Sequence, residues 1–370
     1  MNLQKILNIL GIAEKKVIMA TRNRIVSSQN CKPIIGVVQD ALNGAYILTY
    51  FDTMVPWAVA CDCYTSSGLE SRVQDMLRRA LPFYPKYIRK EKGLYQVVEK
   101  QIPGKLFLSI VFLPDFEYRK KTNAHSKNVE VLIEDGIILP NSGPIDSSVI
   151  GIKSGSVVHI LANEYDTQKA ADFVTDVHFL IDYWFPTYGF SIGISDCQST
   201  ASEMVSKVLL EAEMKCSAII ARKDISNKEK EGLINQELIN CSMVSTTIAD
   251  KHMNKGDRNA FNIMRRTGSK GNVANITSVV AFVGQQNISG QRMTKFLTGE
   301  TRTSYEFKPG DMSPAAGGFV SSSYFKGLNP SEQFAHAGAG RKGGIDTSIK
   351  TAETGYAEKK MTKKMEHFSV

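Results

Sequence analysis

The pattern of hydrophobic and polar residues divides the chain into two parts of different character. From residue 34 to about residue 178, short apolar runs alternate with turns, as at residues 106–113, 129–139 and 155–162. This pattern predicts mainly β-strands. The second run contains Glu134-Asp135-Gly136, a sequence typical of the tip of a β-hairpin.

After residue 198 the apolar residues follow helical spacing. Thr200 and Glu203 form a predicted capping box at the start of one helix. A polar break at residues 224–228 separates it from a second helix. The second helix has apolar residues at helical spacing, namely Ile234, Leu238, Cys241 and Val244. Two consecutive helices with a short polar connection predict an antiparallel hairpin.

A long helix is predicted at the end of the chain. Asn329 can cap it, Pro330 is its first residue, and Glu332 occupies the third position. It extends to about Met365, which corresponds to roughly 54 Å. The helix contains five glycines, each costing up to ~1 kcal/mol relative to alanine; they are Gly338, Gly340, Gly343, Gly344 and Gly355. Such a helix requires neighbours, so we expect a central rod surrounded by ligands.

The composition of the 370 residues is that of a globular protein, with 42% hydrophobic and 22% charged residues. The length allows two or three domains. A net charge of +8 favours an anionic partner. The six cysteines include no CxxC pair and no histidine at zinc-ligand spacing, so no metal site or disulfide framework is predicted. No apolar run approaches the ~18 residues that span a bilayer, so no membrane partner is expected.

Three short motifs match functional signatures only superficially. Residues 189–193 (GFSIG) match the serine-hydrolase elbow around Ser191, but the nominal acid, Asp196, is too close in sequence. Residues 338–343 (GAGRKG) match a dinucleotide fingerprint but fall inside the predicted helix. Residues 268–271 (GSKG) are, by spacing alone, a flexible turn with an exposed cation. The hydrolase interpretation would be abandoned if Ser191 were buried.

Six segments resemble the largest subunit of multisubunit DNA-directed RNA polymerases of the eukaryotic and large-DNA-virus type. They occur in the family's order across nearly the whole chain, with little to match between residues 50 and 128. The segments are SSQNCKPIIGVVQD (27–40), GFSIGISDC (189–197), GSKGNVAN (268–275), VGQQNISGQR (283–292), GFVSSSYFKGL (318–328) and IDTSIKTAETGY (345–356).

The resemblance implies a multidomain α+β architecture. Residues 1–30 would end the active-site domain, and residues 31–198 would form a mainly β pore domain. A helical-hairpin funnel domain would occupy residues 199–328, and a long bridge helix residues 329–370. The implied function is that of a nucleotidyltransferase component, which supplies the nucleotide entry pore, funnel and bridge helix for template-directed RNA synthesis from nucleoside triphosphates (NTPs).

The resemblance also implies roles for particular residues. Thr351 and Ala352 would face the nascent base pair, where small side chains let a base pack against the helix. Lys270 would lie near the NTP phosphates. The remaining roles are support of the bridge helix by Gln285, Gln286 and His336, and DNA-backbone contacts by Lys350, Lys359 and Lys360. From the residues alone, these lysines could also be a solvated helix end.

The family's catalytic Mg²⁺ ions are held by an NADFDGD loop, which is absent from this sequence. Met1-Asn2-Leu3 resembles the residues that directly follow that loop. We therefore expect Mg²⁺ in the assembled enzyme, no metal bound by this chain, and no synthesis by the isolated chain. The expected partners are the second-largest subunit, polypeptides supplying the rest of the largest subunit, the DNA template, the RNA–DNA hybrid and NTPs.

Two questions stay open from the sequence. The absence of the NADFDGD loop and of the family's trigger loop suggests a subunit split between polypeptides, which favours a large DNA virus as the source. A cellular gene interrupted by an intron or intein, or a partial chain, would look the same. The compartment would be host cytoplasm or virion for a viral protein and nucleus for a cellular one. The alternative function is a non-catalytic relic or decoy that binds polymerase partners. Intact Gly268-Ser269-Lys270 and Thr351-Ala352 favour the working fragment.

Overall fold

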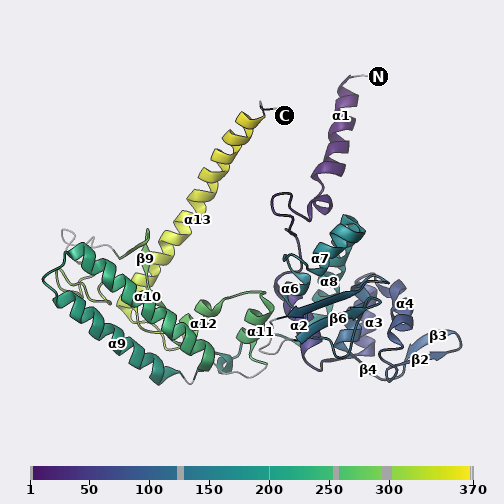
Figure 1. Ribbon diagram of the computed structural model, residues 1–370, viewed down its shortest axis with the longest axis horizontal. Coiled ribbons are helices and arrows are strands. Elements are labelled where there is room, and N and C mark those ends of the chain that lie inside the picture. Colours follow the sequence, from purple (N-terminus) through teal and green to yellow (C-terminus); the bar gives the residue numbers. More distant parts are fainter. Residues whose placement is uncertain are drawn as a thin grey trace. The chain divides into compact units, whose positions relative to one another are not determined.

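The computed structural model describes residues 3–122, 129–199, 201–252, 258–293, 302–366 and 368. The chain folds as two compact units of mixed helices and strands, which agrees with the predicted α+β class (Figure 1). Unit 1 comprises Met1–Ile192 and Asp257–Gly271, and unit 2 comprises Gly193–Gly256 and Asn272–Val370. The division into four domains stays a prediction.

Unit 1 is built around helix α8 (Thr167–Tyr188), against which α2 (Gln39–Tyr50) and α3 (Trp57–Ser66) pack. The middle of α2 is buried on all sides. A Cβ atom at Gly44 would overlap the Ile181 side chain, so the glycine allows α2 and α8 to approach closely. The other helices of unit 1 are α1 (Leu3–Glu14), α4 (Val73–Ala80), α5 (Gly104–Leu108), α6 (Ser147–Ile150), α7 (Val157–Ile160) and α11 (Ala260–Thr267).

The strands of unit 1 form small antiparallel sheets. The largest has the order β5-β6-β7, and its β6–β7 hairpin turns at Asp135-Gly136, as predicted. Both turn residues have positive φ, 48° and 68°, which suits a tight two-residue hairpin loop. β1 pairs with β4 and β2 with β3. The strands are β1 (Met54–Pro56), β2 (Ile88–Glu91), β3 (Leu94–Val97), β4 (Gln101–Pro103), β5 (Tyr118–Thr122), β6 (Val129–Glu134) and β7 (Ile137–Ile138).

The prediction that this region is mainly β is wrong, because more of its residues lie in helices than in strands. Residues 106–113 begin in α5 and continue as a 3-10 turn, and residues 155–162 contain α7. A short apolar run that is buried on every side has no period that separates strand from helix. At residues 155–162 a capping signal was missed, since Ser156 Oγ accepts a hydrogen bond from the backbone N–H of His159 (3.3 Å).

Unit 2 contains the predicted helical hairpin, formed by α9 (Ser202–Ala221) and α10 (Asn227–His252) (Figure 1). The predicted cap Thr200 lies outside the described residues. Ile234, Leu238 and Cys241 are buried between the helices, as expected. Val244 is exposed, and the next buried position is Ser245, because the inward face continues at a spacing of seven from Leu238.

Short strands hold the rest of unit 2 together. β8 pairs with β11, and β9 pairs with β10. The buried Arg292 guanidinium makes a 2.8 Å salt bridge to Glu231 on α10 and donates to the Ser313 carbonyl at 2.9 Å. The elements are α12 (Val273–Val280), β8 (Gly284–Gln285), β9 (Asn287–Ile288), β10 (Gln291–Arg292) and β11 (Phe319–Val320).

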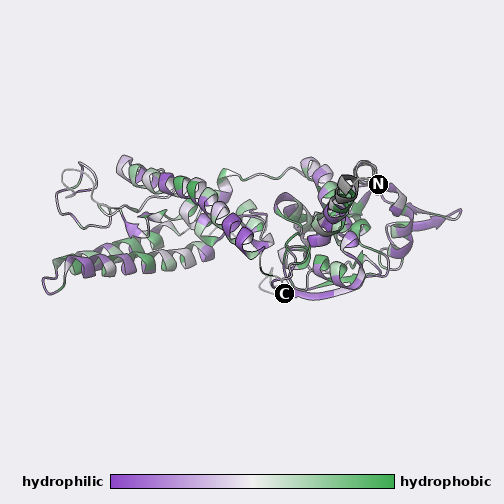
Figure 2. Cartoon of the chain, turned by 90° about the horizontal axis from the view of Figure 1, so that it is seen from above, coloured by the Kyte–Doolittle hydropathy of each residue, from purple (hydrophilic) through white to green (hydrophobic). Residues whose placement is uncertain are grey.

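Helix α13 (Pro330–Met365) has 36 residues, and its start and end agree with the prediction. Only its first turns are packed. The Glu332 carboxylate accepts hydrogen bonds from the backbone N–H groups of Ser321 (2.8 Å), Ser322 (3.1 Å) and Asn329 (3.0 Å). Every residue from 347 to 366 is exposed. In Figure 2, hydrophilic, weakly polar and hydrophobic residues are interspersed along this helix, so it has no continuous apolar side.

The Glu332 anchor predicts a pH-dependent stability of unit 2. Burial acts to raise the pKa of Glu332, but the hydrogen bonds from Asn329, Ser321 and Ser322 lower it below its ordinary value of 4.5. Its contribution to stability is therefore complete above about pH 4.5 and is lost as the pH falls through the lowered pKa. Glu332→Gln should flatten the fall in stability below about pH 4.5, measured by urea unfolding with far-ultraviolet circular dichroism.

Glu358→Gln is the matched control, because Glu358 lies on the exposed part of the same helix. It should keep the wild-type pH profile. Equal pH profiles for Glu332→Gln and the wild type would contradict the anchor.

Candidate functional site

The GSKG segment forms a sharp turn at the end of α11. Asn259 Oδ1 caps the start of this helix by accepting from the Asn262 N–H (3.1 Å). Gly268 ends the helix in the left-handed conformation (φ 74°), and the Ser269 N–H reaches back to the Met264 carbonyl at 3.2 Å. A Cβ atom at Gly268 would lie 2.5 Å from Ser147 Oγ. Both backbone shape and space therefore require glycine here.

Asn43 fixes this turn by hydrogen bonds. It lies in α2 and is only 2% exposed. Its Oδ1 accepts hydrogen bonds from Thr267 Oγ1 (2.9 Å) and Ser269 Oγ (2.7 Å). Sequence analysis missed Asn43, although an amide within an otherwise apolar buried stretch must find a partner. The turn is thus fixed to the core of unit 1.

Lys270 follows this fixed turn and is exposed. It makes no ion pair with any residue in the described ranges. The next residue, Gly271, again has positive φ (75°). The arrangement presents a compact cation on a rigid turn, without a counter-ion among the described residues, which is suited to binding a phosphate group.

The structure brings two of the three predicted support residues together at the base of α13. Gln286 Oε1 lies 3.1 Å from His336 Nδ1, and His336 Nε2 lies 3.1 Å from the Tyr324 hydroxyl. Gln285 instead donates to the Gly317 carbonyl (2.7 Å). Tyr324 was not predicted. Its contact with His336 left no local signal in the sequence, because the two residues belong to different elements.

Thr351 and Ala352 lie on the exposed part of α13. Thr351 Oγ1 donates to the Thr347 carbonyl one turn earlier (2.6 Å), so this hydroxyl is satisfied within the helix. Ile349 and Tyr356, on the same side as Ala352, are 52% and 61% exposed. Exposed apolar residues therefore lie beside small ones on this stretch of α13.

The predicted DNA-binding lysines lie on the same helix and are exposed. Lys350 is 3.4 Å from the Asp346 carboxylate, and Lys360 Nζ lies 4.0 Å from the centre of the Tyr356 ring. The Lys342 ammonium donates to Asp346 and, together with Lys350, holds the pKa of that carboxyl below its usual range. Lys359 makes no ion pair with a residue that the structure describes. The end of α13 is therefore a basic surface.

The hydrolase motif lacks the required structure. Ser191 is exposed, so burial does not exclude it. However, the preceding element is helix α8 rather than a buried strand, and the Asp196 carboxylate accepts from the Gly193 N–H at 3.0 Å. A nucleophile elbow needs a strand before the serine. We therefore reject a hydrolase site.

Among the described residues there is no group of three or more His, Cys, Asp or Glu side chains that could hold a metal ion. Across the same residues, no helix is both long enough and apolar enough to cross a membrane.

Three adjoining family descriptions match this chain. RNA polymerase Rpb1, domain 3, matches residues 24–197. RNA polymerase Rpb1, domain 4, matches residues 211–320, and RNA polymerase Rpb1, domain 5, matches residues 327–370. The GSKG turn falls in the second match and the exposed part of α13 in the third.

The similar proteins are named as subunits of DNA-directed RNA polymerases. DNA-directed RNA polymerase III subunit RPC1 of Homo sapiens is 30% identical over 96% of this chain and 26% of its own length. RNA polymerase II subunit RPB1-A of Trypanosoma brucei brucei is 30% identical over 99% of this chain and 20% of its length. Subunit Rpo1N of Thermococcus celer is 29% identical over 97% of this chain and 42% of its length.

These matches define the class of protein to which the chain belongs. The chain belongs to the family of the largest subunits of DNA-directed RNA polymerases. It spans about a fifth to two-fifths of the length of the relatives named above. Those relatives are cellular and archaeal proteins, so they give no support to a viral source.

The Asn43 clamp makes a prediction about unit 1. Asn43→Ala should lower the free energy of unfolding by about 1 kcal/mol, because the Thr267 and Ser269 hydroxyls lose one of their two acceptors and keep only the Met264 carbonyl (2.9 and 3.2 Å). Combined with Ser269→Ala, the effect should be smaller than the sum by about 0.5 kcal/mol or more. Urea unfolding followed by tryptophan fluorescence measures this, since both tryptophans, Trp57 and Trp184, are in unit 1.

The control pairs Ser269→Ala with Asn30→Ala, an exposed asparagine of the same unit. That pair should be additive. Additivity of the Asn43 pair as well would show that the clamp does not couple the two residues.

Proposed function

We propose that this chain supplies the nucleotide entry pore, the funnel and the bridge helix of a DNA-directed RNA polymerase. The observation that carries this proposal is α13, which is anchored at one end, rich in glycine and exposed over residues 347–366. An isolated helix with this composition is weak in water. Such a helix can be stable if nucleic acid and other polypeptides surround it in the assembled enzyme.

In this proposal the exposed part of α13 contacts the nascent base pair. Thr351 and Ala352 are small, so a base can pack close to the helix backbone there. Lys350, Lys359 and Lys360 would contact the DNA backbone by charge, which makes their contribution dependent on salt. The DNA template and the RNA–DNA hybrid are the partners that fit this surface.

Lys270 would stabilise the triphosphate of the incoming NTP. In nucleotidyl transfer the RNA 3′-hydroxyl attacks the α-phosphate and pyrophosphate leaves. A cation that is already in position stabilises the phosphates without reorganisation during the reaction. The hydrogen bonds that Asn43 accepts from the turn before Lys270 support this role, because they restrict the direction in which the lysine leaves the surface.

Mg²⁺ in the assembled enzyme would activate the attacking hydroxyl and neutralise the leaving group. The described residues of this chain contain no cluster that fits such an ion. We therefore propose that the metal-binding aspartates come from a different part of the assembly, and that this chain by itself synthesises no RNA. The second-largest subunit and the remainder of the largest subunit are the proposed protein partners.

The alternative, a non-catalytic relic or decoy, is favoured by no observation. The two functions differ in one respect that can be measured. A decoy would tolerate bulky residues on the exposed part of α13, because its partners need only be bound.

Ala352→Leu should abolish RNA synthesis by the assembled polymerase, because the larger side chain occupies the space of the nascent base pair. It should leave the folding of the chain unchanged, since Ala352 is exposed. Ala357→Leu is the matched control, an exposed alanine on another side of the same helix. DNA-templated synthesis by the complex purified on a tag on this chain measures the effect. Full activity of Ala352→Leu would contradict the contact with the nascent base pair, and purification of the partners without RNA synthesis by the wild-type complex would favour the decoy.

Lys270→Ala should lower kcat/KM for NTPs about tenfold or more in the same assay, because a phosphate-binding cation is removed. Lys153→Ala, another exposed lysine of unit 1, should have little effect. An equal loss for both variants would indicate a general effect of charge and would refute a specific role for Lys270.

A further inference from the structure

Unit 1 contains a cavity of about 380 Å³ to which the proposed function assigns no role. Three regions that are distant in sequence enclose it: residues 48–54, residues 83–87 and residues 103–105, with Pro140 closing one side. A volume of this size is at the lower end of ligand pockets, about 300–1,000 Å³. The region lies where resemblance to the polymerase family is weakest in sequence.

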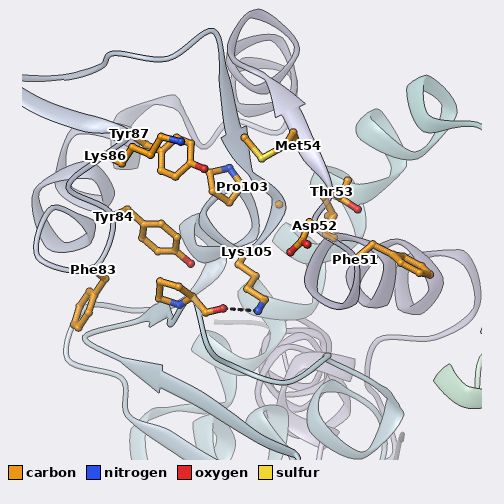
Figure 3. Close-up of a pocket in the computed structure, with 13 residues that line it drawn as sticks. Phe51, Asp52, Thr53, Met54, Phe83, Tyr84, Lys86, Tyr87, Pro103 and Lys105 are labelled. Carbon is orange, nitrogen blue, oxygen red and sulfur yellow. Dashed lines mark hydrogen bonds between the residues drawn. The ribbon is translucent and has the colours of Figure 1, made fainter. Parts of the chain in front are cut away.

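The walls of the cavity are apolar and aromatic. Phe83 and Tyr84 lie on one side of it and Phe51 on the other, while Met54, Tyr87 and Pro103 border the top (Figure 3). Tyr84 is buried, and its hydroxyl donates to the Ile138 carbonyl (2.7 Å), which leaves the ring as the surface that faces the cavity. Met54 is 38% exposed, so an apolar side chain at the border of the cavity is accessible to a ligand. These walls suit one apolar side chain.

Lys105 supplies a charged group at the centre of this apolar site (Figure 3). Its ammonium donates to the carbonyl oxygens of Pro140 and Ser142, both at 2.7 Å. An ammonium has three N–H groups, so one remains. No carboxylate among the described residues lies within ion-pair distance. Burial lowers the pKa of Lys105, and the nearby Asp52 opposes this shift.

Asp52 supplies the complementary group. It is exposed, lines the same cavity and faces Lys105 in Figure 3. A ligand that occupies the space between them must offer an acceptor to Lys105 and a donor to Asp52. A peptide backbone has both groups, a carbonyl oxygen and an N–H. A carboxylate would suit Lys105 but would be repelled by Asp52.

We propose that this cavity binds an apolar residue of another polypeptide, whose carbonyl accepts from Lys105 and whose backbone N–H donates to Asp52. The apolar side chain packs among Tyr84, Tyr87 and Met54. The bound carbonyl completes the set of three acceptors around the Lys105 ammonium, two of which the protein already provides. This arrangement satisfies a partly buried cation without adding charge to the site.

The ligand chemistry can be tested on the full chain by saturation-transfer NMR with three small probes. N-acetyl-leucine N-methylamide has the apolar side chain and both backbone groups, and it should bind in the millimolar range. N-acetyl-glycine N-methylamide lacks the side chain, and N-acetyl-leucine replaces one amide by a carboxylate. Both should give weaker signals. No signal from the leucine amide, or a stronger one from the carboxylate, would overturn the proposal.

Matched variants locate the binding in the cavity. Met54→Arg should abolish the signal, whereas Leu94→Arg, at an exposed apolar residue outside the cavity, should not. Asp52→Ala should weaken binding about tenfold, the loss of a hydrogen bond to a charged group. Asp62→Ala is its exposed control. Because Asp52 is exposed, its variant tests the site even if Met54→Arg fails to fold. Unchanged binding by Asp52→Ala would contradict the assigned donor contact.

The polypeptide source is tested in the purified complex. A photoreactive phenylalanine analogue at Phe83 should crosslink to an apolar residue of another subunit, and Met54→Arg should abolish that crosslink. A crosslink only within this chain, or none, would refute a polypeptide occupant. This result is independent of RNA synthesis, so failure of the proposed polymerase role would leave it intact.

Discussion

The Glu332 carboxylate is the interaction on which the presentation of α13 depends. Its oxygen atoms accept hydrogen bonds from the backbone N–H groups of Ser321, Ser322 and Asn329, at distances of 2.8–3.1 Å. Glu332 and Ala335 are the buried residues of the helix. The direction of 36 residues is therefore set within the first two turns. A helix held in this way can bend along its glycine-rich length while its start stays in place.

The GSKG turn follows the same physical rule on a smaller scale. The exposed Lys270 is positioned by a buried polar contact, in which Asn43 accepts hydrogen bonds from the hydroxyls of Thr267 and Ser269. A buried amide without partners would be costly, so the contact favours a single arrangement of the turn. In both places, a chemically simple exposed surface is positioned by satisfied polar groups beneath it. Binding then requires little reordering of the protein.

Local signals explain which predictions succeeded. The Asp135-Gly136 hairpin and the start of α13 at Pro330 each depend on residues within four positions of one another. The failures at residues 106–113 and 155–162 have different causes. Residues 106–112 are all buried, so this run carries no period and neighbouring elements decided between strand and helix. Residues 155–162 are only partly buried, and there the missed signal was the cap at Ser156.

By itself, the sequence determined the family, the α9–α10 hairpin, the glycine-rich α13 and the residues Lys270, Thr351 and Ala352 as candidates. Tertiary structure alone decided what surrounds them. Asn43 and Ser269 are 226 positions apart, and Lys105 is 35 positions from Pro140. Contacts of this kind leave no periodic trace, because their energy depends on burial and geometry that only the folded chain creates.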